Sequence, residues 1–241
     1  MILSNIKKLI KKDQFITSYR SIFSNPFFII RNGIYKALLN LAPRLEGKLL
    51  DVGCGSKPYE ELFSVKEYIG LDIEESGHPH ENEIIDIFYD GKRIPFEDQI
   101  FDSVFASEVF EHVFNLDELV KEIHRVTKRD GKLLITVPFV WDEHEIPYDF
   151  ARYSSYGLES ILNQNGFKIL EHVKTTSFIE TIGQLLISYI NQHFLPKNRY
   201  ANIVLTCLIL TPLTLVFLIL GKILPNSKTL YLNNVILCVK T

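Results

Sequence analysis

The sequence predicts an α/β fold: a mostly parallel seven-stranded sheet with helices on both faces, and a hydrophobic helical hairpin inserted before the last strand. Three observations support this prediction. Short apolar runs rich in Val, Ile and Leu alternate with segments of helical periodicity, which is typical of a parallel sheet covered by helices. A glycine turn follows the first of these runs. An uncharged segment, 203–220, precedes the final apolar run.

The expected elements follow one another in a regular order along the chain. Amphipathic helices are expected at 3–12 and 26–41, and Asn25-Pro26 favours the start of the second. Three more helices are expected at 115–127, 155–165 and 178–195. The expected strands cover 48–52, 68–72, 84–89, 101–106, 132–137, 167–173 and 231–239.

These elements predict three parts. Residues 1–44 form basic amphipathic N-terminal helices, 45–177 and 229–241 form the main α/β domain, and 178–228 form the hairpin insertion. Residues 1–48 hold nine Lys or Arg and two acidic residues, a net +7, which leaves −10 for the rest of a chain of net charge −3. This distribution indicates either an anionic partner surface or a solvated helix face, and no nucleic-acid partner is expected.

The cysteines and the N-terminal residues indicate the cellular compartment. Cys54, Cys207 and Cys238 have no disulfide or ligand spacing, so the sequence predicts a reducing compartment and no metal. Lysines interrupt the apolar residues near the N-terminus, and no small-residue cleavage site follows. No signal peptide is therefore expected.

Residues 49–56 read as a strand that runs into a glycine turn. Gly53 and Gly55 let the backbone approach a ligand closely, and the helix that follows presents free N–H groups to it. Asp72 ends the next strand, 21 residues after Asp51, the spacing at which an acid binds ribose hydroxyls in doubly wound folds. A nicotinamide-dependent dehydrogenase would need a small residue where Pro58 stands, so that alternative is weaker.

Four segments, in order along the chain, carry a resemblance to class I S-adenosylmethionine-dependent methyltransferases of the large type 11 bacterial group. They are Asp51–Ser56, Ile94–Val104, Ser107–Val113 and Glu122–Leu133. The resemblance implies a Rossmann-like fold, S-adenosylmethionine as cofactor, and methyl transfer as the reaction. Lys57 departs from the pattern, because many members have a third glycine at this position near the methionine end of the cofactor.

The same resemblance implies a cofactor site. Its predicted residues are Asp51, Gly53, Cys54, Gly55, Asp72, Ile73, Asp90, Ser107 and Glu108. The first four would hold the methionine portion, Asp72 the ribose, and Asp90, with Asp86 in reserve, the adenine amino group. Asp90 fits the first position of an Asp-Gly turn equally well. Ser107 and Glu108 would line the pocket near the methyl group.

Residues 138–153, after the fifth strand, are the expected acceptor side, because ligands of such sheets bind beyond the carboxyl ends of the strands. The segment combines the only Trp of the chain with a His, several acids and an Arg. A hydroxyl acceptor needs a base, for which His144 is the first candidate and Glu145 the second; the alternative is that His144 only pins the loop. Arg152 either holds an anionic acceptor group or pairs with Asp149. The predicted acceptor contacts are Trp141, Arg152 and Tyr153.

Two residues just after the fourth strand, Glu111 and His112, fit helix-capping or structural roles as well as chemical ones. Such a pair does not by itself indicate a reaction. The acceptor also stays open at this stage, since a lipid, a lipid-linked sugar, a quinone-like ring and a small metabolite all suit the same loop.

The uncharged segment 203–220 has the length of a transmembrane candidate. A single crossing would separate the sixth and seventh strands, which pair in one sheet in the resembling family, and would leave an edge unpaired. We therefore expect a hairpin that turns at 195–198 and lies in the interface, on the inner face of the cell membrane. The alternative is a hairpin buried in protein.

The predicted function is methyl transfer from S-adenosylmethionine to a small-molecule, lipid or lipid-linked acceptor at the cytoplasmic membrane surface. The protein would then be cytoplasmic, and peripheral or monotopic at that membrane. The alternative is a non-catalytic, membrane-attached module that binds S-adenosylmethionine.

Overall fold

The computed structural model describes residues 14–74, 84–196 and 198–241, so the expected helix at 3–12 lies outside the described residues. The chain forms two compact units. One consists of residues up to 36 together with 174–233, and the other of 37–173 together with 234–241. The second unit contains the sheet, and the first contains the hairpin.

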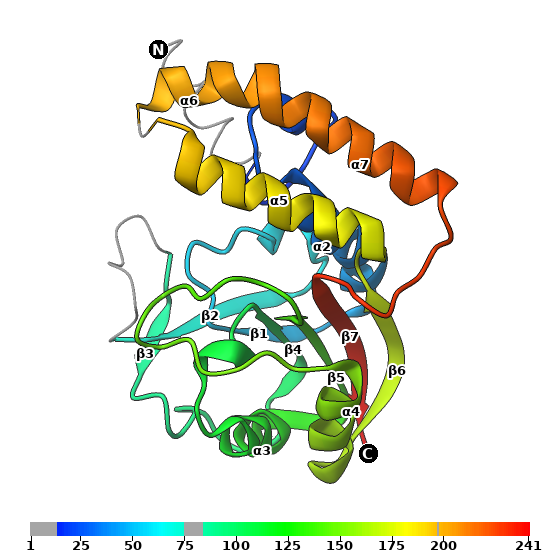
Figure 1. Cartoon of the computed structure of the whole chain (residues 1–241). Coiled ribbons are helices and arrows are strands. Elements are labelled where there is room, and N and C mark those ends of the chain that lie inside the picture. The colour runs from blue at the N-terminus through cyan, green and yellow to red at the C-terminus, as the bar shows by residue number, and fades with distance from the viewer. Residues whose placement is uncertain (1–13, 75–83, 197) are drawn as a thin grey trace. The chain divides into compact units, whose positions relative to one another are not determined.

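A seven-stranded sheet has the order β3-β2-β1-β4-β5-β7-β6 (Figure 1). The strands are β1 (Lys48–Val52), β2 (Glu67–Ile73), β3 (Ile87–Tyr89), β4 (Phe101–Ser107), β5 (Thr127–Pro138), β6 (Phe167–Lys174) and β7 (Asn233–Lys240). Strand β1 pairs in parallel with β2 and with β4, and the parallel pairing extends to β3 and β5. The sheet and the helical insertion between β6 and β7 confirm the predicted fold class.

The central strands are apolar because both of their faces are covered. Leu49 and Leu50 of β1 and Val104 of β4 have no exposed surface, as a parallel sheet between helices requires. Helices α3 (Leu116–Val126) and α4 (Ser155–Gln164) lie on one face of this sheet. Their apolar sides join the same core cluster.

Three elements differ from the sequence prediction. The helix expected after the glycine turn is only a 3₁₀ turn, Glu60–Leu62. Strand β3 is shorter than expected, because the amide of Ile84 bonds to Gly55 and that of Asp86 to Gly70 outside the β2–β3 register. Strand β5 starts at Thr127, directly after α3, five residues before the expected start at 132. The Thr127 hydroxyl donates to the Ile123 carbonyl, 2.6 Å away, and closes the helix.

The insertion is an antiparallel pair of helical arms. Its first arm is α5 (Phe178–Phe194); its second arm is α6 (Arg199–Leu205), a π-helical turn (Thr206–Leu210) and α7 (Thr211–Ile223), and Figure 1 shows α5 beside α7. A capping box between Ser177 and Glu180 starts the first arm. The arms approach closely at Gly183, where a Cβ would lie 2.3 Å from the Phe217 ring, so only glycine fits.

Polar residues of the insertion are used inside its own unit. The buried Gln184 side chain accepts hydrogen bonds from the amides of Ile29 and Ile30 at 3.0 and 3.2 Å, and donates to the Pro26 carbonyl. These amides open α2 (Phe28–Leu41), so Gln184 supplies the acceptor that the first turn of a helix needs. The buried Thr211 hydroxyl donates to the Ile22 carbonyl.

The second arm is apolar and largely uncovered. Residues Ala201–Ile223 form the one helix among the described residues that is long and apolar enough to cross a membrane, with mean hydropathy 2.8 and 22% of its most apolar window buried. Leu208 and Ile223 are 68% and 73% exposed. The other strongly exposed apolar side chains of this arm are Val204, Ile209, Leu215, Val216 and Ile219. An exposed apolar surface of this extent marks an interaction site.

Candidate functional site

The glycine turn and the end of β2 meet at one point, as predicted. One carboxylate oxygen of Asp72 accepts from the Gly55 amide at 2.8 Å, and the other accepts from the Ile73 amide at 2.8 Å. Gly53 and Gly55 both have positive φ, 69° and 46°, so they supply the turn that carries the chain past the carboxyl ends of β1 and β2. This places the predicted ribose-binding acid beside the predicted methionine-binding turn.

Asp51 is buried at the end of β1. The Tyr68 hydroxyl donates to its carboxylate at 2.6 Å. Burial raises the pKa of Asp51 to about 7, although the Tyr68 bond opposes this shift. Burial also raises the pKa of the neighbouring Cys54 thiol, with a contribution from Asp51, so Cys54 is a neutral part of the turn rather than a nucleophile.

Lys57 stands where many members of the resembling family have a third glycine. Its side chain packs against Gly70 of β2. Its φ is 49°, in the left-handed region that a glycine would adopt without strain. Its buried ammonium pairs with Asp86, which also accepts from the Gly70 amide at 2.6 Å. A Cβ at Gly70 would lie 2.4 Å from Lys57 Cε, so Gly70 leaves the space that this lysine occupies. The reserve adenine-binding acid, Asp86, is thus engaged by a lysine.

Asp90 follows β3 and forms a turn, one of its two predicted roles. Its carboxylate accepts from the amides of Lys92 and Arg93 at 3.0 and 3.3 Å. It also lines an open hollow together with Tyr89 and Phe96. Burial raises the pKa of Tyr89 to about 12, and the carboxylates of Asp72 and Asp90 add to the shift, so the two acids predicted for ribose and adenine both act on Tyr89. The role of Asp90 in adenine binding stays a prediction.

Ser107 and Glu108 lie where β4 ends, tied to β5 by Thr136. The Ser107 and Thr136 hydroxyls lie 2.8 Å apart, and the Thr136 hydroxyl lies 2.7 Å from the Glu108 carboxylate. Glu108 has a φ of 56°, which is uncommon for a non-glycine residue and is seen most often at functional sites. Its amide bonds to the Thr136 carbonyl, which holds this conformation.

Arg152 organises the loop after β5. Its guanidinium forms two bonds with Asp149, at 2.5 and 2.7 Å, and donates to the backbone carbonyl of Asp142 at 2.9 Å and more weakly to that of Trp141 at 3.4 Å. The Arg152 hydrogen bond holds the pKa of Asp149 at about 2. Arg152 therefore pairs with Asp149, one of its two predicted roles, and its contact with an acceptor stays a prediction, as does that of Trp141.

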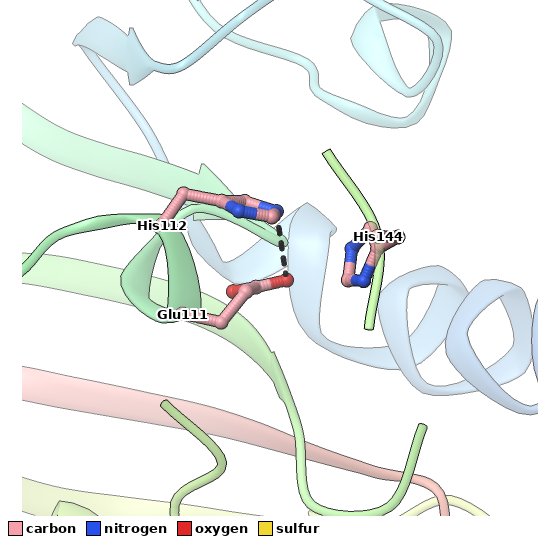
Figure 2. Close-up of side chains that lie close together, drawn as sticks. All are labelled: Glu111, His112 and His144. Atoms are coloured by element: carbon pink, nitrogen blue, oxygen red, sulfur yellow. Dashed lines mark ion pairs between the residues drawn. The ribbon is translucent and has the colours of Figure 1, made fainter. Parts of the chain in front are cut away.

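The same loop brings His144 to the segment after β4. The 3₁₀ turn η4 (Phe110–His112) holds the loop through its backbone, since the Glu111 carbonyl accepts from the amides of Phe150 and Ala151. The His112 and His144 rings meet edge to face with centroids 4.8 Å apart. Figure 2 shows the Glu111 carboxylate and the two imidazoles turned toward one another.

Glu111 is the most unusual group in this cluster. It is 0% exposed, and neither carboxylate oxygen has a hydrogen-bond partner among the residues that the structure describes. Its closest cationic candidate is His112 Nε2, 3.7 Å from Oε1. Burial raises the pKa of Glu111 well above its ordinary value, and the neighbouring Glu108 raises it further. Burial and Glu111 also raise the pKa of Tyr153.

The sequence pointed to His144 and Glu145 one by one, and left Glu111 and His112 open between a structural and a chemical role. The structure brings these four residues together: Glu145 lies 3.6 Å from His112 Nε2. A one-turn helix has no periodicity to read, so the only sequence signal for this grouping is an acid followed by a histidine just beyond a strand.

The residues at the glycine turn fit S-adenosylmethionine. A carboxylate at the end of β2 suits two ribose hydroxyls, and the buried acid of β1 beside a positive-φ turn suits the polar methionine end. The roles of the single residues stay predictions.

Comparison with known proteins agrees with this fit. Residues 50–135 match the type 11 family model described as a methyltransferase domain. An uncharacterized protein of Methanocaldococcus jannaschii is 30% identical over 127 residues, which are 52% of this chain and 60% of that protein. The chain thus spans less than two thirds of this curated relative.

Solved structures show the same fold at low sequence identity. A chain from the complex of the Haloferax volcanii Trm112 methyltransferase activator with a methyltransferase has a TM-score of 0.55 and 20% identity, and the likeness covers 86% of this chain and 89% of that one. Phosphoethanolamine N-methyltransferase 2 of Haemonchus contortus, in complex with S-adenosyl-L-methionine, has a TM-score of 0.50 and 20% identity, with 95% and 58% covered. Residues 50–135 thus carry a methyltransferase domain of this type, and the solved structures share its fold.

Proposed function

We propose that the whole protein transfers a methyl group from S-adenosylmethionine to a lipid or lipid-linked acceptor at the cytoplasmic surface of the membrane. The observation that carries this proposal is the exposed apolar arm Ala201–Ile223, inserted between two neighbouring strands of a methyltransferase sheet. An apolar arm on a methyltransferase would bring the enzyme to acceptors that are themselves held in the membrane.

The reaction needs little covalent chemistry from the protein. S-adenosylmethionine supplies a methyl group on a sulfonium: a bond forms between the acceptor atom and the methyl carbon, the methyl–sulfur bond breaks, and its electron pair stays on sulfur. The chain must align the acceptor and exclude water. The loop 138–153 is our acceptor side, because it follows β5 and is held rigid by Arg152 and Asp149.

A hydroxyl acceptor also has to give up its proton. In this proposal His144 takes up that proton. Glu145, whose side chain is one third exposed, is the second candidate base. His144 is itself held by the loop: its amide donates to Asp149 at 2.9 Å. The base role of His144 stays a prediction.

The apolar face of the first arm supports the membrane part of the proposal. Phe178, Ile182, Leu186 and Tyr189 are exposed and recur every three or four positions, so they share one side of α5, and Phe194 is exposed at the end of the helix. Lys222 and Lys228 flank the second arm and suit anionic head groups.

Two measurements test the proposal. Flotation with vesicles of anionic phospholipid tests attachment: the wild-type chain should float, while Leu208→Glu with Ile219→Glu should stay with the soluble fraction. Tyr156→Glu, at an aromatic residue on α4 that is 79% exposed, is the control outside the insertion and should float. Wild-type protein that ignores vesicles and needs no detergent would refute membrane attachment.

Turnover is measured separately, with methyl-labelled S-adenosylmethionine and membrane extracts. We expect label in the lipid-extractable fraction. Label in water-soluble metabolites alone would refute the lipid acceptor but leave methyl transfer standing. Cofactor binding without any labelled product would favour the non-catalytic binding module instead.

A further inference from the structure

The unpartnered carboxylate of Glu111 calls for a physical explanation. A buried polar group without a hydrogen bond is destabilising, and a charged one is more so, so native proteins rarely keep one. Glu111 is 0% exposed. Within the described part of the chain both of its oxygens lack hydrogen-bond partners, and it faces two imidazoles (Figure 2). A cation between these three side chains would satisfy it.

We propose that Glu111, His112 and His144 bind a divalent transition-metal cation. One ligand atom from each residue lies within 4.8 Å of the others. A cation at the centre of such a triangle would lie about 2.8 Å or less from each atom, against the 2.0–2.2 Å typical of zinc bound by nitrogen or carboxylate oxygen. Side-chain movements of about 0.6–0.8 Å would close this difference.

The imidazoles are held in the form that a metal requires. His112 Nδ1 lies 2.8 Å from the Tyr148 carbonyl oxygen, so it donates its N–H there and leaves the Nε2 lone pair facing Glu111. His144 Nδ1 lies 3.2 Å from the Asp142 carbonyl and 3.3 Å from Asp149, which favours the same tautomer, although Arg152 also approaches this nitrogen at 3.3 Å. Metal-binding histidines usually donate their second N–H to a carbonyl or carboxylate in this way.

The charges around the cluster favour a cation. Glu108 and Glu145 both act on Glu111 with the same sign, while Arg152 is the opposing charge. That guanidinium is already bonded to Asp149 and to the backbone of its own loop, so the acids remain in excess.

The donor set also indicates which cations fit. Two imidazole nitrogens with one or two carboxylates suit zinc, iron, manganese or cobalt better than magnesium or calcium, which prefer oxygen alone. Three protein ligands leave coordination positions open, as in catalytic sites.

The place of the cluster gives the cation a use, and this step rests on the proposed function. Glu111 and His112 follow β4, and His144 lies in the loop after β5. Both segments are next to Glu108, which we expect near the methyl group. An acceptor that carries a hydroxyl or carboxylate oxygen could fill an open position and be held there for attack. His144 would then act as a ligand in place of the predicted base.

Metal binding is tested on the full-length protein in detergent, stripped with EDTA and titrated with cobalt(II) and manganese(II) chloride. Cobalt absorption reports the ligand field, and manganese electron paramagnetic resonance counts the bound ions. We expect one ion per chain, visible cobalt d–d bands and a higher melting temperature. Glu111→Gln and His144→Gln should each weaken binding about 100-fold or more, and His193→Gln, at an exposed histidine on α5, should leave it unchanged.

Glu111→Gln carries a second readout that guards against misfolding. Because it replaces a buried carboxyl that has no hydrogen-bond partner among the described residues by a neutral amide of the same shape, its metal-free form should melt no lower than the metal-free wild type, while the metal-induced rise disappears. The inference would be overturned if the wild type failed to bind one ion at millimolar metal, or if Glu111→Gln and His144→Gln both bound metal as tightly as the wild type. Calorimetry with S-adenosylmethionine separates the two proposals: metal-free protein that binds the cofactor normally leaves the proposed function standing, and metal binding without methyl transfer leaves only the site.

Discussion

Asp72 gives the sharpest test of the cofactor site, because the structure shows which backbone amides its carboxylate already binds. Its carboxylate already holds the Gly55 and Ile73 amides at 2.8 Å, and we expect it to accept from two ribose hydroxyls as well. A hydrogen bond to a charged group contributes about 1.5–3 kcal/mol. Since about 1.4 kcal/mol is tenfold in affinity, Asp72→Asn should weaken S-adenosylmethionine binding roughly 10- to 100-fold.

Asp72→Ala should weaken binding more than Asp72→Asn, because it also leaves the Gly55 amide without its partner. Titration calorimetry with S-adenosylmethionine gives both affinities. Asp130→Asn is the matched control: it makes the same change near the start of β5, at the amino ends of the strands, and Asn tolerates the φ of 60° there. Wild-type affinity in Asp72→Ala, or an equal loss in the control, would refute the assignment.

Three more predictions test the buried acid of β1 and the packing of the hairpin insertion. Because folded Asp51 has its pKa raised to about 7 from an ordinary value near 4, the native state holds a proton that the unfolded state loses; stability of the cofactor-free protein should fall as pH rises from about 4 to about 7, and thermal melts of Asp51→Asn should lack this slope. Gly183→Ala should destabilise the hairpin by about 1–3 kcal/mol through the Phe217 ring, and adding Phe217→Leu should restore part of the loss in melting experiments. Gln184→Leu should cost about 2–4 kcal/mol by leaving two amides of α2 unpaired; an unchanged melting temperature would contradict this.

The sheet could be read from the sequence wherever a strand is bounded by its own residues. Strand β1 has the predicted bounds because Gly47 and Gly53, both with positive φ, end the extended backbone on either side. Strand β5 could not be bounded in this way. Its first residue is fixed by pairing with Phe101 of β4, and the register then shifts before Ser103, so the strand starts where its neighbour needs it.

The two sites differ in the same respect. The Asp72–Gly55 bond was predictable because parallel strands bring their carboxyl ends to one edge, so spacing along the chain becomes proximity. The Glu111–His144 approach was not, because it depends on backbone bonds from Phe150 and Ala151 to the Glu111 carbonyl. Loop bonds of this kind leave no periodic signal, which is why the acid–histidine pair after β4 stayed open between a structural and a chemical role.

The position of the insertion constrains how the protein can meet a membrane. Strands β6 and β7 are neighbours in one sheet, and the chain between them contains both helical arms. A single crossing by Ala201–Ile223 would put β7 across the bilayer from β6 and strip two strand edges of their hydrogen bonds, at a cost of many backbone groups. The buried Gln184, held by α2, shows in addition that the first arm has polar partners within its unit, and these would be lost if that arm entered hydrocarbon. Interfacial binding keeps both sets of bonds and still buries the exposed apolar face, so it is the arrangement that the connectivity favours.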